Sequence, residues 1–371
     1  MNDLEYMRRA IELARQGAGW TSPNPMVGAV IVNNGRIIGE GYHKKYGELH
    51  AERNAFASLT ESAQDATLYV TLEPCCHQGR QPPCTEAVIE HGISRVVIGS
   101  RDPNPLVSGK GAEILRKHGI TVEEDFLKEE CDALNPVFFH YITTGLPYVV
   151  MKYAMTLDGK IATHTGASKW ITGETARQHV HELRGRYSAI LAGIGTVISD
   201  DPLLNCRIDG AHQPARIIAD SHLRIPLDSR IVKTAGEYRT IVACADTNSE
   251  KEAALRSMEV EILHTSNQQG KVNLRDLIEY LGREKIDSVL IEGGGQIHEA
   301  ALREGIVNHV CAYIAPKLFG GATAKTPVEG LGVNLPDEAA ILHNLQTTQL
   351  GEDILLEYDM KEGMNGVYRN C

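Results

Sequence analysis

The segment His50-Ala51-Glu52, followed by Pro74-Cys75 and then by Cys84, constrains this chain more than any other feature of its sequence. One histidine and two cysteines supply three protein ligands to a zinc ion. They leave a fourth position open for water, as a catalytic zinc site requires and a structural site does not. The ligands come from three separate segments, so the fold must bring these segments together around one ion.

The position of Glu52 indicates the kind of chemistry. It lies two residues from His50, close enough to reach a zinc-bound water without binding the metal. Zinc deaminases of nucleobases have the pattern H-x-E followed by P-C-x-x-C, in which the metal activates water and the glutamate shuttles protons. The sequence therefore predicts a zinc-dependent deaminase with His50, Cys75 and Cys84 as ligands and Glu52 as the catalytic acid–base group.

An insert between the two cysteines leaves the ligand assignment open in one respect. Cys76 and His77 follow Cys75 directly, and either could replace it as a ligand. Adjacent residues rarely point at one metal, so Cys76 is interpreted as a packed thiol and His77 as a candidate substrate contact.

Composition argues against a nucleic-acid partner. The 371 residues suffice for two domains, and the net charge is −11. Lys and Arg number 14 against 19 Asp and Glu before Pro147, and 23 against 29 from there on, so neither half is basic.

No signal peptide, membrane span or regular pairing of the eight cysteines is visible. We therefore expect a cytoplasmic protein with reduced thiols and no membrane partner.

Strands and helices alternate along the chain, which predicts an α/β sheet covered on both faces. In the first half, helices are expected at 4–14, 51–59, 84–91 and 111–118, and strands at 27–32, 36–42, 67–72 and 95–100. Asn33-Asn34-Gly35 predicts a hairpin turn, and 127–146 a connecting helix. The zinc ligands would then lie at helix starts beside strand ends, where thiolates are favoured.

A second pattern begins at Pro147. Strands are expected at 148–155, 189–193, 216–220, 240–245 and 288–291, and helices at 175–186, 250–258 and 273–282. Gly293-Gly294-Gly295 follows a strand and precedes a helical stretch, so its amides could approach a phosphate, although a plain turn is an open alternative. The polar tail is expected to be frayed.

Motifs in both halves, in this order, resemble the bifunctional deaminase–reductase of riboflavin biosynthesis. In the first half they are Pro23-Asn24-Pro25, Gly41-Tyr42-His43, His50-Ala51-Glu52, Glu73-Pro74-Cys75, Pro82-Pro83-Cys84 and Asp102-Pro103-Asn104-Pro105. In the second half they are Leu157-Asp158-Gly159-Lys160, Ser168-Lys169-Trp170, Gly195-Thr196-Val197, Asp200-Asp201-Pro202, Glu292-Gly293-Gly294 and Ala315-Pro316-Lys317.

The resemblance implies a cytidine-deaminase-like three-layer αβα domain at 1–146, a dihydrofolate-reductase-like α/β domain at 147–362 and a tail at 363–371. It implies two consecutive reactions. First, 2,5-diamino-6-ribosylamino-4(3H)-pyrimidinone 5′-phosphate loses its 2-amino group to water. The ribose of the product is then reduced by NADPH to ribityl, giving 5-amino-6-ribitylamino-uracil 5′-phosphate. Zn²⁺ and NADPH are the cofactors expected.

The resemblance also implies the binding residues. Those that would hold the first substrate are Asn24, His43, Arg80 and Asn104, and a solvated loop charge is an open alternative for Arg80. Those implied along the second substrate are Ser168, Arg184, Leu204, Arg207 and Glu292, with the two arginines at its phosphate. Those implied at NADP are Ala154, Trp170, Thr196, Asp200, Ser221, Gly294 and Gly295. Lys152 and Asp200 are candidate polar partners near the reacting carbon, but no reductase general acid is identified.

Two alternative functions compete with this prediction. One is a different zinc deaminase, acting on tRNA adenosine or a free nucleobase, with an unrelated second domain; the acidic balance and the second set of motifs argue against it. The other is a metal-stabilised binding protein in which Glu52 is a solvated helix residue. A structural zinc normally takes four protein ligands, and no fourth is evident. We expect small phosphoribosyl pyrimidines as partners and a homo-oligomeric assembly.

Overall fold

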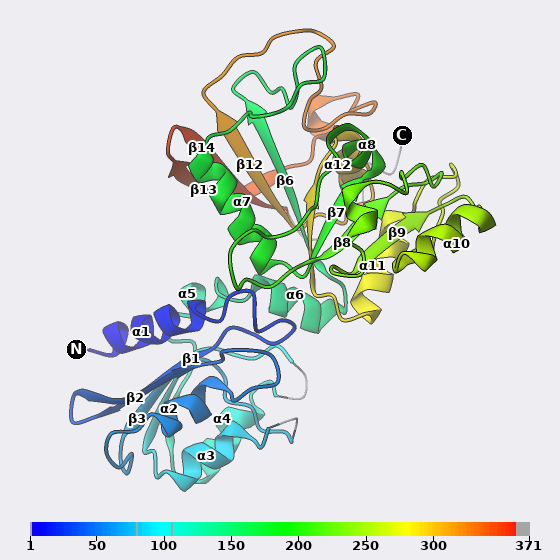
Figure 1. The fold of residues 1–371 in the computed structure, drawn as a ribbon. Helices are drawn as coiled ribbons and strands as arrows, with labels where there is room; N and C mark the ends of the chain where they lie inside the picture. The colour runs from blue at the N-terminus through cyan, green and yellow to red at the C-terminus, as the bar shows by residue number, and fades with distance from the viewer. Residues whose placement is uncertain (1, 79–80, 105–106, 361–371) are drawn as a thin grey trace. The chain divides into compact units, whose positions relative to one another are not determined.

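The computed structural model describes residues 2–78, 81–104 and 107–360. The chain divides into two compact units, Met1–Gly145 and Leu146–Cys371, each built on its own sheet (Figure 1). The expected α/β class is confirmed in both. The expected tail, 363–371, lies outside the described residues. Within the described ranges, no helix combines the length and apolar character needed to span a bilayer.

The first unit contains a five-stranded mixed sheet in the order β2-β1-β3-β4-β5. Its strands are β1 (Gly28–Asn33), β2 (Arg36–Tyr42), β3 (Thr67–Leu72), β4 (Arg95–Ser100) and β5 (Thr121–Glu123). The predicted hairpin joins β1 to β2, and its turn residues Asn34 and Gly35 have φ values of 48° and 73°. Asparagine and glycine tolerate this left-handed conformation, which the tight turn requires.

Helices cover both faces of this sheet, so the unit has three layers. Alternate strand residues such as Val30 and Tyr69 pack towards α1 (Asp3–Arg15) and α5 (Lys128–Asp132). The residues between them, such as Ile31 and Leu68, pack towards α2 (Ala51–Ala57), α3 (Cys84–Glu90) and α4 (Lys110–Lys117). Side chains that alternate in direction along each strand produce these two cores.

The prediction of a single connecting helix at 127–146 is wrong. Two helices occupy this stretch, α5 and α6 (Pro136–Thr144), and they are separated at Asn135. Pro136 lacks an amide hydrogen and begins the second helix, because proline is tolerated in the first turn but not in a helix interior. The Asn135 side chain instead bonds to the backbone of Met26 in both directions, at 2.8 and 2.9 Å, which anchors the break.

The second unit contains a nine-stranded sheet in the order β10-β9-β8-β7-β11-β6-β12-β14-β13. The strands from β10 to β12 are parallel, and the β13–β14 hairpin adds an antiparallel edge. Its strands are β6 (Tyr148–Thr156), β7 (Ala189–Gly193), β8 (Ala215–Ala219), β9 (Thr240–Cys244), β10 (Val260–His264), β11 (Ser288–Glu292), β12 (His309–Ala315), β13 (Leu342–Leu350) and β14 (Asp353–Met360). The helices are α7 (Glu174–Arg186), α8 (Ile194–Asp200), α9 (Arg230–Lys233), α10 (Ser249–Ser257), α11 (Leu274–Arg283), α12 (Gly295–Arg303) and the 3₁₀ turn η1 (Pro336–Glu338).

The parallel arrangement gathers the carboxyl ends of β6, β7, β8 and β11 along one edge of the sheet. In open α/β sheets, ligands bind in the crevice outside these ends. Half of the residues implied at NADP and the second substrate lie on these strands or shortly after their ends, so the topology brings that half together: Ala154, Thr196, Ser221, Glu292, Gly294 and Gly295.

Candidate active sites

The three expected zinc ligands lie at the starts of two helices and after one strand. His50 is the residue preceding α2, Cys84 is the first residue of α3, and Cys75 follows β3. Apolar faces of both helices pack on the sheet, which fixes the two helix starts beside the end of β3. Segments far apart in sequence thus converge at one point.

Their geometry fits a zinc ion. The Nδ1 atom of His50 lies 3.4 Å from the Sγ of Cys75 and 3.4 Å from the Sγ of Cys84. In a tetrahedral site with Zn–S near 2.3 Å and Zn–N near 2.0 Å, two such ligands are about 3.5 Å apart. Cys76, the alternative ligand, is not part of this converging group within the described residues.

Electrostatics favour thiolate at Cys75, whereas the hydrogen bond to Cys75 and burial raise the pKa of Cys84. Hydrogen bonds from Cys84 and His50 lower the pKa of Cys75 despite its burial. The amide of Cys84 also donates to the Cys75 sulfur at 3.4 Å. A metal requires deprotonated cysteine, so these contacts prepare one ligand before any ion arrives.

Glu52 lies in the first turn of α2 beside these ligands, with 3% of its surface exposed. Burial, and then the neighbouring Cys75, raises the pKa of this carboxyl group. A carboxylate held in a dry site can take up and release a proton nearer to neutral pH than one in water. Its placement matches a proton-shuttling group rather than a solvated helix residue.

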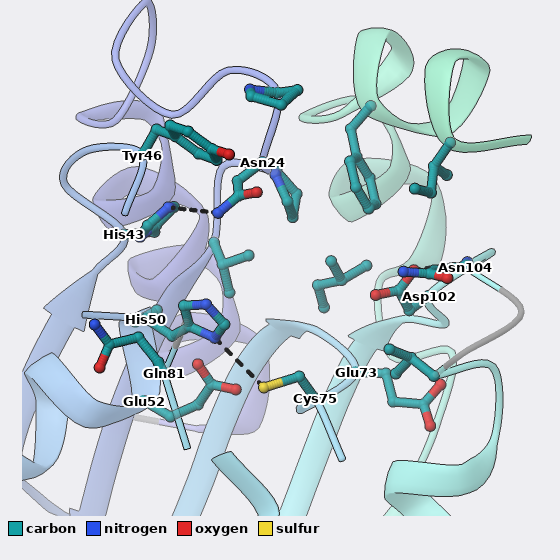
Figure 2. Close-up of a pocket in the computed structure, with 18 of the residues that line it drawn as sticks. Asn24, His43, Tyr46, His50, Glu52, Glu73, Cys75, Gln81, Asp102 and Asn104 are labelled. Atoms are coloured by element: carbon teal, nitrogen blue, oxygen red, sulfur yellow. Dashed lines mark hydrogen bonds between the residues drawn. The ribbon is translucent and has the colours of Figure 1, made fainter. Parts of the chain in front are cut away.

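The cluster opens into a cavity of about 330 Å³ within the first unit. Figure 2 shows His50, Glu52 and Cys75 at its base, Asn24 and His43 on one wall, and Asp102 and Asn104 on the facing wall. Phe138, Tyr141 and Ile142 of α6 add an apolar border. The second of the two helices that sequence patterns merged into one therefore helps to enclose the site.

His43 and Asn24 form a fixed pair on one wall. The Nδ1 of His43 lies 3.0 Å from the carbonyl oxygen of Leu49, which can only accept, so this nitrogen carries the hydrogen. Its Nε2 then accepts from the Asn24 amide at 3.3 Å, and burial lowers the pKa of His43 and keeps it neutral. The Asn24 carbonyl oxygen stays available for a ring amino group.

Asp102 is a wall residue that sequence reasoning did not assign, although the motif Asp102-Pro103-Asn104 contained it. Burial raises its pKa to about 6, and its Oδ1 accepts a hydrogen bond from the backbone N–H of Asn104 at 2.8 Å. Tyr46, Glu48 and Gln81 also line the cavity without any motif to mark them. Arg80, expected at the substrate phosphate, lies outside the described residues.

The second group of site residues centres on Glu292 at the end of β11. Arg184 of α7 grips this carboxylate with two bonds, Nε to Oε1 at 2.7 Å and Nη2 to Oε2 at 2.9 Å. Lys152 of β6 lies 3.8 Å from the same carboxylate. Burial alone would raise the pKa of Glu292, but Arg184 and then Lys152 lower it to about 2. Arg184, expected at the substrate phosphate, is thus already engaged by an anion.

A buried amide borders this ion pair. Arg184 donates to the backbone oxygen of Asn205 at 3.2 Å, and the Asn205 side-chain oxygen is buried without a hydrogen-bond partner within the described structure. A buried acceptor left unpaired costs free energy and points to a donor supplied from outside.

The other residues expected along the second substrate differ in exposure. Leu204, which directly precedes Asn205, has φ of 49°, and the side chain of Arg207, two residues after Asn205, is exposed. Ser168 is half-buried in a separate loop after β6.

The residues expected at NADP occupy the strand ends described above. Ala154 lies in β6, Thr196 in the first turn of α8 after β7, and Ser221 after β8. The Gly293–Gly295 turn joins β11 to α12, with Gly294 preceding the helix at φ of 41°. A Cβ on Gly293 would lie 2.6 Å from the Thr196 hydroxyl, so only glycine permits this approach.

Trp170 and Asp200 complete the expected cofactor set. Trp170 is 62% exposed, and the Arg177 guanidinium lies 4.9 Å from its ring centroid. The Lys169 ammonium donates to the backbone oxygen of Asp200 at 3.4 Å, which ties the Trp170 loop to the end of α8. An exposed aromatic ring of this kind offers a flat surface on which a nicotinamide or adenine ring can stack.

Comparisons with known proteins agree with this division. The family model for the cytidine and deoxycytidylate deaminase zinc-binding region matches residues 1–100, and that for the RibD C-terminal domain matches 147–356. The riboflavin biosynthesis protein RibD of Actinobacillus pleuropneumoniae is 56% identical, covering 96% of this chain and 95% of its own. That of Bacillus amyloliquefaciens is 41% identical, covering 98% and 99%.

Solved structures extend the likeness to the fold. One form of Acinetobacter baumannii RibD has a TM-score of 0.87 at 39% identity, covering 97% of this chain and 99% of that one. A diaminohydroxyphosphoribosylaminopyrimidine deaminase/5-amino-6-(5-phosphoribosylamino)uracil reductase from Thermotoga maritima has a TM-score of 0.84 at 40% identity, covering 96% and 98%.

Proposed function

This chain belongs to the RibD family, whose members join a zinc-dependent deaminase to a reductase of riboflavin biosynthesis, and we propose how its own residues divide the two reactions. It is a bifunctional enzyme that deaminates and then reduces, with Zn²⁺ and NADPH as cofactors. We assign deamination to residues 1–146 and reduction to 147–362. The observation that carries the first assignment is the convergence of His50, Cys75 and Cys84 beside the buried Glu52.

In the deaminase, His50, Cys75 and Cys84 would hold the zinc ion. When bound, zinc lowers the pKa of water towards about 7 and so supplies a nucleophile at neutral pH. Glu52 takes the proton of the attacking water and delivers it to the ring nitrogen beside C2. Glu52 next takes the proton of the hydroxyl group now bonded to C2 and passes it to the amino group, so the C–N bond breaks, C2 becomes a carbonyl carbon and ammonia leaves. A buried carboxyl with a raised pKa suits both steps, because it must accept and release protons within one cycle.

The cavity walls position the pyrimidine for this attack. The Asn24 carbonyl oxygen, oriented by His43, accepts from a ring donor, and Asn104 contacts the opposite edge. Arg80 pairs with the phosphate, as guanidinium groups do through two parallel bonds. We add Asp102 to this set because it is a buried carboxyl in the cavity wall.

In the reductase, NADPH supplies a hydride and the chain supplies position and polarity. The cofactor contacts proposed are Ala154, Trp170, Thr196, Asp200, Ser221, Gly294 and Gly295, and the substrate contacts are Ser168, Arg184, Leu204, Arg207 and Glu292. The Lys152 side chain is only 13% exposed, and desolvation lowers its pKa, so it is a candidate proton donor beside the reacting C1′ carbon. Arg184 acts at the substrate chiefly by holding Glu292 in place.

The test separates the two activities by supplying each substrate to each variant. Glu52→Gln should release ammonia roughly 10²–10⁴-fold more slowly, while it still oxidises NADPH when given the deaminated intermediate. Arg207→Ala should show the reverse pattern, because a methyl group cannot replace the phosphate contact of a guanidinium. Loss of both activities in both folded variants would refute the two-site assignment.

We further propose that the protein acts in the cytoplasm as a homo-oligomer. Support for assembly comes from β13, an edge strand that pairs with β14 alone among the described strands and exposes nearly all of its residues. Uncovered edges tend to pair with another strand. Light scattering at several concentrations tests this, and a monomer throughout would remove the proposal.

A further inference from the structure

A second group of metal-binding side chains lies in the reductase unit, on one face of the β12–β14 ladder. His309 and Cys311 are two residues apart in β12, so their side chains point to the same face of the sheet. The antiparallel register places Asp359 opposite His309 and Glu357 opposite Cys311. Four side chains with metal-binding chemistry are thus brought together by two adjacent strands, far along the chain from His50.

The distances within this group suit a single ion. The Nε2 of His309 lies 3.7 Å from the Oε1 of Glu357, and the Sγ of Cys311 lies 3.9 Å from that oxygen. The candidate ligand atoms of all three residues lie within 4.8 Å of one another. Tetrahedral zinc separates N, S and O ligands by roughly 3.3–3.6 Å, so the two distances to Glu357 need to contract by only a few tenths of an ångström.

Asp359 supplies the outer support that metal-binding histidines normally have. Its Oδ1 accepts from the Nδ1 of His309 at 2.8 Å, and Asn344 donates to its other oxygen at 3.0 Å. Hydrogen bonding of one ring nitrogen to a carboxylate fixes the tautomer and leaves the other nitrogen free for a metal. Here the remaining nitrogen, Nε2, is the one that faces Glu357.

We propose that His309, Cys311 and Glu357 form a second zinc-class site, distinct from the deaminase centre, which joins the edge hairpin to β12. The mixed N, S and O ligand set selects a borderline transition-metal ion such as Zn²⁺ over Mg²⁺ or Ca²⁺. Cys311 is 1% exposed, whereas the Glu357 side chain is 25% exposed, so the ion could enter past the carboxylate. Three protein ligands leave one position for water.

A metal-free ion cluster is the competing interpretation. Burial alone would lower the pKa of His309, but Cys311, Glu357 and Asp359 raise it to about 10, so a protonated imidazole could bridge the carboxylates without a metal. Of the other groups that face the cluster, the positive charges of Arg186 and Lys152 oppose a cation, whereas burial lowers the pKa of His179 and keeps it neutral. A measurement of metal content therefore decides between the two.

The chain contains a matched control for this measurement. Cys244 lies 3.5 Å from the Nδ1 of His264, and Glu252 lies 3.1 Å from the Nε2 of the same ring. The residue types are the same, but the thiol and the carboxylate contact opposite nitrogens of the imidazole and cannot converge on one ion. Cys244→Ser thus removes a buried thiol beside a histidine without removing a candidate site.

The experiment is zinc content per chain of the full-length protein, after equilibration with micromolar free zinc and removal of excess. Wild type and Cys244→Ser should retain about two ions, and Cys311→Ser and Glu357→Gln about one. Asp359→Asn should weaken the second ion roughly 10–100-fold, as loss of outer-shell support does.

A spectroscopic measurement covers the case in which Cys311→Ser does not fold. In a Cys75→Ser/Cys84→Ser background, Co²⁺ should still give a thiolate charge-transfer band, contributed by Cys311. If that background is itself unfolded, Co²⁺ titration of wild type against Glu357→Gln and Asp359→Asn gives the same answer. A wild-type content of one zinc, unchanged by Glu357→Gln, would overturn the proposal and leave the ion cluster.

Discussion

Replacing Glu292 by Gln should destabilise the reductase unit strongly, because Arg184 would lose its anionic partner inside the protein. The two side chains are 8% and 15% exposed and share two hydrogen bonds of 2.7 and 2.9 Å. Removing one member of a buried ion pair leaves the other charge uncompensated, at a cost of about 3–5 kcal/mol. Glutamine keeps the size of the side chain but not the charge.

The pKa of Glu292 gives a second value for the expected loss of unfolding free energy. A fall from 4.5 to about 2 corresponds to about 3 kcal/mol of preference for the ionised form in the folded state. Since the folded pKa is depressed, this stability is present above pH 4.5 and is lost as pH falls towards 2. The difference in unfolding free energy between wild type and Glu292→Gln should therefore shrink as pH falls below 4.5.

The assay is urea unfolding at pH 7, followed by hydrogen exchange in peptides from β6 and β11, which report on this unit alone. A loss of about 3–5 kcal/mol would lower the melting temperature of a unit of this size by roughly 6–20 °C. Glu261→Gln is the control, because Arg239 grips Glu261 with similar geometry, at 2.8 and 3.0 Å, but in an exposed position, where it also pairs with Glu284 at 2.8 Å. Exposed pairs contribute about 0–1 kcal/mol. Equal effects of the two substitutions would refute the argument from burial.

Three further predictions concern the sites. Cys84→Ala should remove the deaminase zinc and Cys76→Ala should not, as measured by zinc analysis; the opposite result would reassign the ligand. Because the pKa of Asp102 is about 6, its carboxylate should bind substrate donors above that pH, so the deaminase KM should rise as pH falls through 6 in wild type but stay flat in Asp102→Asn. Gly295→Ala should weaken NADPH binding at least severalfold and leave ammonia release intact, because a Cβ there would lie 2.4 Å from the Glu329 side chain; unchanged cofactor titration would exclude this turn from the NADP site.

Sequence periodicity located elements with strong local signals and missed those set by tertiary context. The Asn34-Gly35 turn and β3 were predicted at their observed positions, since turn chemistry and a buried apolar run are local properties. The break at Asn135 had a local signal, Pro136, that the prediction of one helix passed over, whereas the bonds to Met26 that anchor the break come from a distant segment. No pattern predicted β12–β14, and β13 in particular is an exposed edge without alternating apolar residues.

The candidate sites divide in a similar way. Spacing alone marked His50 and Glu52, because ligand and proton carrier share one helix turn. Asp102 was inside a quoted motif, but that it lines the cavity became evident only from the structure, where it follows β4 and lies in the wall with Asn104. The grip of Arg184 on Glu292 joins residues 108 positions apart, and an arginine has no local pattern that distinguishes a phosphate ligand from a buried counter-ion.

The two units contain buried glutamates with opposite acid strengths, and the difference follows from their neighbours. Glu52 and Glu292 are 3% and 8% exposed, so burial disfavours the charge of both. The neighbour with the largest effect on Glu52 is the sulfur of Cys75, whose negative charge adds to burial and raises the pKa of Glu52. A raised pKa suits a group that must gain and lose a proton. Beside Glu292 stand Arg184 and Lys152, and its pKa falls to about 2, which suits a fixed anion. Replacing each by glutamine should therefore have different consequences: Glu52→Gln should abolish proton transfer with little loss of stability, whereas Glu292→Gln should first reduce stability, because the charge itself is what the fold requires there.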